Sequence, residues 1–97
     1  MRTCYIVAYD IADPKRLQRV HRTMRGYGDP LQYSVFRCVL SPSERILLIE
    51  ALTPLIHHRE DQVMLIDLGP ADGRAQTCFE TLGRALATQS ERITVVV

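Results

Sequence analysis

Two prolines each follow a residue that commonly caps a helix, and together they mark where two helices of this chain begin. Asp13 precedes Pro14, and Ser41 precedes Pro42. A side-chain oxygen at the cap accepts a hydrogen bond from the first turn, and proline is well tolerated at the first helical position. The sequence therefore predicts one helix from Pro14 to about Arg25 and a second helix that begins at Pro42.

Segments rich in strand-forming residues lie before, between and after these helices. They cover residues 2–9, 31–40 and 62–68, and apolar runs of this length and composition are typical of strands. Residues 31–40 fit one long bent strand or two short ones, and the pattern leaves both open. Residues 62–68 are nearly all apolar, which predicts a central strand. Residues 76–82 suit either a strand or a helix.

Residues 93–97, with the sequence ITVVV, form a strongly β-prone apolar segment. Such a segment would aggregate if it stayed unpaired, so we expect it to join a sheet, either in its own chain or in a partner. A chain of 97 residues also buries a smaller share of its surface than a larger one does. Both points favour a homodimer of a single domain that spans residues 1–97, with its core in residues 2–83.

The order of these elements is strand, helix, strand, helix, strand and strand, which is typical of the α+β class. We predict a single, mainly antiparallel sheet with both helices on one face, and the ferredoxin-like topology fits this order best. The second helix is expected to turn an apolar face to the sheet and to end near residues 57–59. That face is predicted to consist of Ile46, Leu47, Ile49, Leu52 and Leu55.

The first helix combines an apolar face with a strongly basic one. Leu17, Val20 and Met24 share one side of a helical projection. Four cations, with no acidic residue among them, are the candidates for nucleic-acid binding: Lys15, Arg16, Arg19 and Arg22. Because phosphate contacts dominate the affinity of nucleic-acid-binding proteins, the helix predicts binding to DNA or RNA. An ordinary solvated helix surface is the alternative interpretation.

Asp10 ends the first strand, directly before the loop to the first helix. Mg²⁺ takes oxygen ligands and usually needs only one or two protein carboxylates, because it keeps several waters. In a two-fold homodimer, two copies of Asp10 can meet across the axis, and a metal held there can stabilise charge on a scissile phosphate. The alternative is that Asp10 only hydrogen-bonds the turn ahead of the helix.

Other candidate groups are predicted to be structural. His57 and His58 have no cysteine or acidic ligand pattern around them, and His21 is expected to pack at the border of the apolar helix face. Tyr33 and Phe36 are expected on opposite faces of their strand, which argues against a base-stacking RNA reader.

The remaining sequence features concern the compartment. Three cysteines, widely spaced and odd in number, predict neither a disulfide framework nor a zinc ribbon. The first apolar run is too short for a membrane span and lacks the layout of a secretory signal. We therefore expect a cytoplasmic protein that does not enter a membrane.

Three segments together resemble a known family. The first is YDI at positions 9–11, followed by the basic helix. The second is GYG at positions 26–28 with QYSVF at positions 32–36, which fits the pattern Q-x-S-V-F, and the third is DQV at positions 61–63. This combination resembles the family called CRISPR-associated protein two over residues 2–68, and more loosely in the tail.

The resemblance implies a ferredoxin-like homodimer in which the C-terminal strand, at about residues 92–97, completes the partner's sheet. It also implies that Asp10 faces its symmetry mate and holds Mg²⁺ or Mn²⁺ as both metal ligand and catalytic residue. Three further residues match the family's motifs and are secondary candidates for a catalytic site: Tyr9, Ser34 and Phe36. Arg16 and Arg19 match its basic helix start. Pro30 stands where many members carry a basic residue, which removes one phosphate contact.

Two roles follow from the resemblance. In some members the dimer cleaves RNA or DNA with a metal ion; in others it is a non-catalytic bridge between two dimers of the integrase, CRISPR-associated protein one, and lines up protospacer DNA. We expect the bridging role in spacer acquisition, with a free-standing Mg²⁺-dependent endonuclease as the competing role. A ferredoxin-like binding module that takes no nucleic acid is the third possibility.

Overall fold

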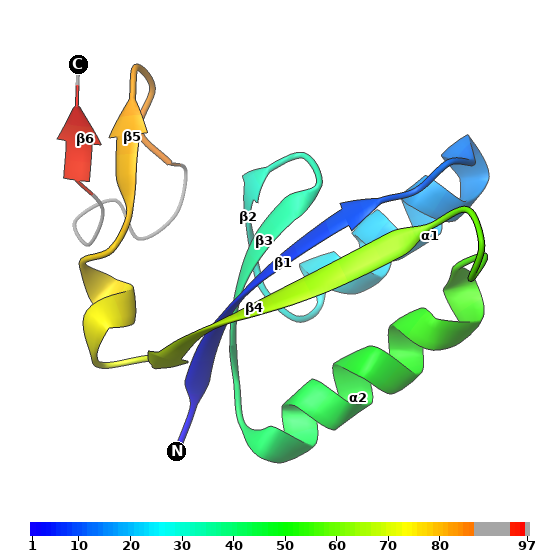
Figure 1. The fold of residues 1–97 in the computed structure, drawn as a ribbon, viewed down its shortest axis with the longest axis horizontal. Coiled ribbons are helices and arrows are strands. Elements are labelled where there is room, and N and C mark those ends of the chain that lie inside the picture. The colour runs from blue at the N-terminus through cyan, green and yellow to red at the C-terminus, as the bar shows by residue number, and fades with distance from the viewer. Residues whose placement is uncertain (87–93, 97) are drawn as a thin grey trace.

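A computed structural model describes residues 1–86 and 94–96 of the chain. Figure 1 shows the arrangement of its elements. In chain order they are β1 (Thr3–Asp10), α1 (Pro14–Arg25), β2 (Asp29–Gln32), β3 (Val35–Leu40), α2 (Pro42–Leu52), the 3₁₀ turn η1 (Thr53–Leu55), β4 (Gln62–Pro70), the 3₁₀ turn η2 (Arg74–Gln76), β5 (Glu80–Leu82) and β6 (Thr94–Val96).

The main sheet has the strand order β2-β3-β1-β4. Strand β1 lies in its interior and pairs antiparallel with both β3 and β4, and β2 pairs antiparallel with β3. This order and these directions are those of a ferredoxin-like α+β fold, so the predicted fold class is confirmed. Residues 31–40 contribute to two strands, β2 and β3, which form a hairpin.

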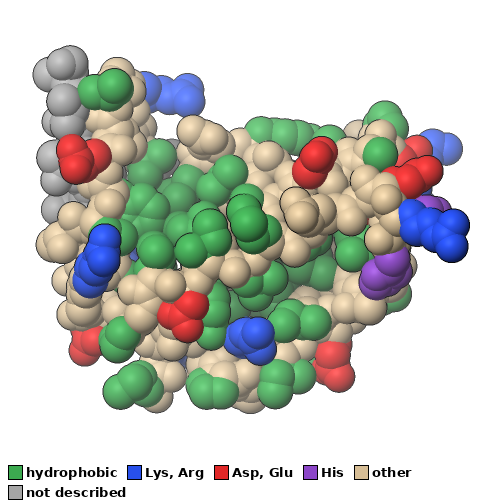
Figure 2. All heavy atoms as spheres, viewed as in Figure 1, with side chains coloured by type: hydrophobic (Ala, Val, Ile, Leu, Met, Phe, Trp, Pro, Cys, Tyr) green, Lys and Arg blue, Asp and Glu red, His purple; other side chains and the backbone are tan. Residues whose placement is uncertain are grey.

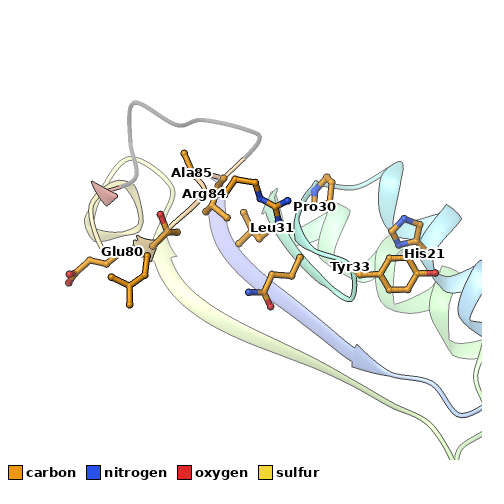
Figure 3. A pocket seen from close by; sticks show the side chains of 11 residues that line it. His21, Pro30, Leu31, Tyr33, Glu80, Arg84 and Ala85 are labelled. Carbon is orange, nitrogen blue, oxygen red and sulfur yellow. The ribbon is translucent and has the colours of Figure 1, made fainter. Parts of the chain in front are cut away.

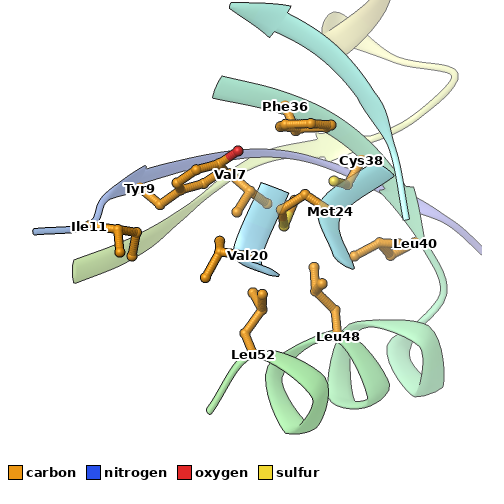
Figure 4. Close-up of a cluster of buried hydrophobic side chains, with 10 residues drawn as sticks. All are labelled: Val7, Tyr9, Ile11, Val20, Met24, Phe36, Cys38, Leu40, Leu48 and Leu52. Carbon is orange, nitrogen blue, oxygen red and sulfur yellow. The ribbon is translucent and has the colours of Figure 1, made fainter. Parts of the chain in front are cut away.

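Both helices cover the same face of this sheet, as predicted (Figure 4). The core contains side chains from alternate positions of β1 and β3 together with inward residues of both helices. Its members include Val7, Tyr9, Phe36, Cys38 and Leu40 from the strands and Val20, Met24, Leu48 and Leu52 from the helices. Among the described elements, neither α1 nor α2 covers the opposite face of the sheet.

Strand β4 lies at an edge of the main sheet, so the prediction that residues 62–68 form a central strand is wrong. Val63 and Leu65 pack against the core, whereas Met64 and Ile66 on the other face are 47% and 41% exposed. A continuous apolar run is typical of a central strand in a sheet that has helices packed on both faces. At β4 the helices α1 and α2 cover one face only, so the apolar run leaves Met64 and Ile66 on the surface.

The two helix starts agree with the sequence prediction. The Asp13 carboxylate accepts a hydrogen bond from the backbone N–H of Arg16 at 2.9 Å. Ser41 and Glu44 form a reciprocal capping box, in which each side chain accepts from the other's backbone N–H. Both caps are local in the sequence, which is why they can be predicted from it.

The predicted apolar face of α2 is wrong in two positions. Ile46 and Leu47 are 54% and 53% exposed, whereas Leu48 and Leu52 are the buried residues of the helix. The helix is apolar on most sides, so periodicity alone could not select the face that packs. The helix also ends earlier than expected, at Leu52, and residues 57–59 lie in the following loop.

The C-terminal part of the chain forms a separate small sheet. Strand β6 (Thr94–Val96) pairs in parallel with β5 (Glu80–Leu82), at one end of the molecule in Figure 1. The ambiguous residues 76–82 therefore end in a strand. Residues 92, 93 and 97 of the predicted exchanged strand lie outside the described residues, and exchange with a partner stays a prediction. Within the described residues, none of the helices has the length and hydropathy of a membrane span.

Candidate nucleic-acid interface

Asp10 is the last residue of β1, opposite Gln62 of β4, and its side chain is exposed. Within the described residues its carboxylate takes part in no hydrogen bond or ion pair. The turn ahead of α1 is held by other carboxylates, because Asp61 accepts from the backbone of Ala12 and Asp13 accepts from Arg16. The structure therefore does not support the interpretation that Asp10 serves to bond this turn, and its oxygens face solvent.

Asp61 is the buried carboxylate that fixes the loop beyond Asp10. Its side chain is fully buried and accepts from the backbone N–H of Ala12 at 2.9 Å and of His57 at 2.8 Å. The guanidinium of Arg16 donates to it at 2.8 and 3.2 Å. One side chain thus ties α1 and the loop before β4 to the residues that follow Asp10. In the sequence Asp61 is distinguished only by its place in the DQV segment, because its partners Ala12 and Arg16 lie far away in the chain.

Arg16 differs from the other cations of α1 because it is paired with carboxylates. Its guanidinium pairs with Asp61 at 2.8 Å and with Glu60 at 3.0 Å, and its side chain is only 24% exposed. The hydrogen bond from Arg16 holds the pKa of the Asp61 carboxyl well below its usual range, and the same bond raises the pKa of Arg16. Its positive charge is therefore balanced by carboxylates of the chain, and its contact with nucleic acid stays a prediction.

Replacing Asp61 with asparagine is expected to lower the urea midpoint of unfolding at pH 7. The further fall of this midpoint as the pH is lowered should be smaller in the variant than in the unaltered chain. The carboxyl has a lower pKa in the folded chain than in the unfolded one. The stability it contributes is therefore complete above the unfolded value of about 3.9 and is lost as the pH falls through the folded value. Urea titrations between about pH 2 and pH 7 measure this difference.

The matched control for this variant is Asp72→Asn, which changes an exposed aspartate in a loop. It should leave the midpoint and the acid decline unchanged. Glu44 keeps a share of the pH dependence in both variants, because the backbone hydrogen bond from Ser41 lowers its pKa. Identical acid profiles for Asp61→Asn and the unaltered chain would show that Asp61 is not coupled to folding.

The other predicted cations do lie on an exposed face of α1. Lys15, Arg19 and Arg22 are all exposed, and within the described residues none of them pairs with a carboxylate. Arg25, in the last turn of the helix, is exposed as well. Cations without acidic partners are available to phosphates, which is the contact that positions a protein on nucleic acid.

The secondary candidates Tyr9, Ser34 and Phe36 lie together at the end of β1 and the start of β3. The backbone N–H of Tyr9 donates to the carbonyl of Ser34 at 3.0 Å. Phe36 is fully buried and stacks on Tyr9 at a centroid distance of 6.2 Å. Burial raises the pKa of Tyr9 to about 12, so its hydroxyl keeps its proton near neutral pH. Tyr9 and Phe36 therefore belong to the core, and a catalytic role for them and for Ser34 stays a prediction.

The chemistry of Asp10 fits a hard cation such as Mg²⁺ only in part. A carboxylate with free oxygen lone pairs suits this ion, which also keeps several water ligands. One such residue per chain supplies few ligands, and within residues 1–86 no three His, Cys, Asp or Glu residues cluster to hold a metal. A second copy of Asp10, brought by a two-fold partner, would complete a two-carboxylate site.

Pro30 lies in the edge strand β2, opposite Phe36, and brings no charge to the site. Proline lacks a donor for the ladder and is tolerated at sheet edges. With proline at this position, β2 contains no cation.

Comparisons with known proteins agree with the resemblance seen in the sequence. The family model described as CRISPR associated protein Cas2 matches residues 2–74. The CRISPR-associated endoribonuclease Cas2 1 of Rhodospirillum rubrum is 44% identical over 92 residues, which cover 95% of this chain and 89% of that one. The CRISPR-associated endoribonuclease Cas2 of Geobacter sulfurreducens is 43% identical over 72 residues, 74% of this chain and 76% of that one.

Solved structures with a similar fold are also found. The hypothetical protein TT1823 from Thermus thermophilus aligns with a TM-score of 0.69 at 28% identity, over 71% of this chain and 84% of that one. Streptococcus pyogenes Cas2 aligns with a TM-score of 0.64 at 32% identity, over 68% of this chain and 86% of that one.

Proposed function

Because the chain belongs to the CRISPR associated protein Cas2 family, we propose that it is a homodimeric, nucleic-acid-binding subunit of CRISPR spacer acquisition. In this role it acts in the cytoplasm and bridges subunits of the integrase, CRISPR-associated protein one. The observation that carries the proposal is the exposed face of α1 formed by Lys15, Arg19 and Arg22, which no described carboxylate neutralises. Two such faces in a dimer would give a bridge six cations for the phosphates of one duplex.

The exposed apolar surface supports the homodimer. Met64 and Ile66 are exposed on the face of the sheet that α1 and α2 do not cover, and Figure 2 shows a broad apolar area in the middle of one side of the molecule. Such areas on a small protein commonly mark interaction surfaces. Strand β4 also has no partner on its outer side among the described strands. A strand from a second chain would satisfy the backbone groups on that edge.

The exposed carboxylate of Asp10 supports a potential metal site in this dimer. Two copies of Asp10 across the two-fold axis would hold Mg²⁺, or Mn²⁺, between the protomers. Bound there, the ion would supply charge stabilisation at a phosphate and an acidified water. The chain itself contributes the fixed position of Asp10, since Asp61 holds the loop that follows it.

A second candidate function is that of a free-standing Mg²⁺-dependent endonuclease acting on RNA or DNA. The names of the relatives from Rhodospirillum rubrum and Geobacter sulfurreducens, both CRISPR-associated endoribonucleases, favour it. This function and the bridging function use the same dimer and differ in what they require of Asp10. A nuclease needs the carboxylate for its reaction, whereas a bridge needs only the cations.

The variant Asp10→Asn separates the two functions. If the chain acts as a bridge, the variant is expected to remain a dimer. Its affinity for duplex DNA should stay within about two-fold of that of the unaltered chain, because the phosphate contacts come from α1. Any Mg²⁺-dependent cleavage of labelled RNA or DNA should fall at least about a hundredfold. Light scattering, a binding titration and a cleavage assay with Mg²⁺ or EDTA measure the three quantities.

Asp72→Asn provides the control, since it removes one exposed aspartate away from the end of β1. It should change neither binding nor cleavage. Cleavage that requires both Mg²⁺ and Asp10 would make the chain an enzyme. Loss of duplex binding in Asp10→Asn alone would contradict the assignment of binding to α1, and a lack of salt-dependent binding in the unaltered chain would contradict the proposed function altogether.

A further inference from the structure

Tyr33 is an exposed aromatic residue whose ring is held flat against a second ring. It lies in the turn between β2 and β3 and is 62% exposed. Its ring stacks on the imidazole of His21 from α1, with centroids 4.9 Å apart and an angle of 18° between the planes. Figure 3 shows the two side chains next to each other at the side of a cleft. Among the described aromatic side chains, only His21 stacks on Tyr33, and the exposure of Tyr33 leaves part of its surface accessible to a ligand.

Two buried residues, Tyr9 and Phe36, contact the stacked pair of Tyr33 and His21 and hold it in place. The hydroxyl of Tyr9 lies 2.9 Å from Nδ1 of His21 and donates to the backbone carbonyl of Tyr33 at 3.2 Å. The hydroxyl of Tyr9 has one proton, and it donates that proton to the carbonyl of Tyr33. Its contact with His21 is therefore a hydrogen bond in which the N–H at Nδ1 of His21 donates to the hydroxyl oxygen of Tyr9. Phe36 meets the edge of His21 at 5.4 Å. The orientation of Tyr33 is thus set before any ligand arrives.

Cations flank this stacked pair on two sides. Arg25 is one helical turn beyond His21 on α1, so the two residues are neighbours on the helix surface, and Arg25 is exposed. The cleft beside Tyr33 has a volume of about 960 Å³ and is lined across from the rings by Arg84 and by one acid, Glu80. Gln32 and Thr81 add polar groups to its walls.

We propose that Tyr33, supported by His21, is a stacking platform for an unpaired base of single-stranded nucleic acid, with Arg25 and Arg84 beside it for the adjoining phosphates. This inference rests on the proposed nucleic-acid binding and extends it from duplex backbone to unpaired ends or strands. It departs from the sequence-based expectation against base stacking, because Tyr33 lies in the turn between β2 and β3 and stacks on His21 instead of sharing a strand with Phe36. Aromatic rings next to a cationic track are the usual means of holding single strands, because every base offers a flat face. Preorganisation of the ring lowers the ordering cost of binding.

The platform discriminates between single and double strands for a geometric reason. Bases inside a duplex are already stacked on their neighbours, so their faces cannot reach a protein ring without unstacking. The cations of α1 contact phosphates of either form. Tyr33 should therefore affect the binding of single strands and leave duplex binding to Lys15, Arg19 and Arg22.

The test compares Tyr33→Ala with Tyr33→Phe, which keeps the ring. Three labelled probes are used: a mixed-sequence single strand of about 12 nucleotides, the same backbone without bases, and a duplex of the same length. For Tyr33→Ala we expect about tenfold weaker binding of the single strand, and unchanged binding of the abasic strand and the duplex. Tyr33→Phe should match the unaltered chain on all three. Thermal melting confirms that both variants fold.

Other outcomes overturn the inference and can be distinguished from failure of the proposed function. Unchanged single-strand binding in Tyr33→Ala, with salt-dependent duplex binding intact, would remove the platform and leave the proposed function standing. An equal loss on the abasic strand or on the duplex would show that Tyr33 does not act through bases. If the unaltered chain binds none of the three probes, both the platform and the proposed function are wrong.

Discussion

Replacing Arg19 and Arg22 together with alanine is expected to weaken the binding of duplex DNA at least about a hundredfold at low salt. Both side chains are exposed on α1, one helical turn apart, and no described carboxylate competes for them. Each phosphate contact that is lost also removes about one unit from the slope of log affinity against log salt. A dimer loses four such contacts, so its salt dependence should become much shallower. Titrations at several salt concentrations measure both quantities.

The matched control removes the same charge elsewhere. Arg59 and Arg74 are exposed arginines outside α1, and the double variant Arg59→Ala with Arg74→Ala lowers the net charge equally. It should weaken binding by no more than a few-fold through the general field of the protein. Equal losses in the two double variants would show that only net charge matters and that α1 carries no specific interface.

Arg16 illustrates which part of the site the sequence could not provide. It stands among the other cations of α1, and helical periodicity alone gives no reason to treat it differently. Its partners Glu60 and Asp61 lie more than forty residues later in the chain. The same limit applies to Tyr33, whose stacking on His21 joins a turn to a helix. Contacts between segments far apart in the chain decide these roles, and local patterns do not contain them.

In the fold, too, features set by neighbouring residues could be predicted from the sequence, and features set by residues far apart in the chain could not. The starts of α1 and α2 were predictable because Asp13 and Ser41 bond within their own first turns. The edge position of β4 was not, since an apolar sequence does not tell which faces of a strand are covered. Asp10 was predictable as an exposed carboxylate at a strand end. That Asp61, and not Asp10, accepts hydrogen bonds from the turn was not predictable, because Asp61 lies far away in the chain.

Gly28→Ala is expected to be the most destabilising single substitution among the described glycines, with a loss of about 3 kcal/mol in the free energy of unfolding. A Cβ atom at Gly28 would lie 2.4 Å from the carbonyl oxygen of Arg37 and 2.5 Å from Sγ of Cys38. The first is backbone of the strand β3, and Cys38 is fully buried in the core. Neither can withdraw without moving the sheet, so strain or repacking must follow.

Gly26→Ala is the matched control two residues earlier. There a Cβ would meet only the carbonyl oxygen of Thr23, at 3.4 Å, and the backbone has an ordinary right-handed helical conformation. Alanine should be neutral or slightly stabilising at this position, because it restricts the unfolded chain. Thermal melting should separate the two variants by roughly 15 °C. Equal melting temperatures would mean that the hairpin of β2 and β3 can shift away from α1, and the orientation of Tyr33 would then not be fixed by the fold.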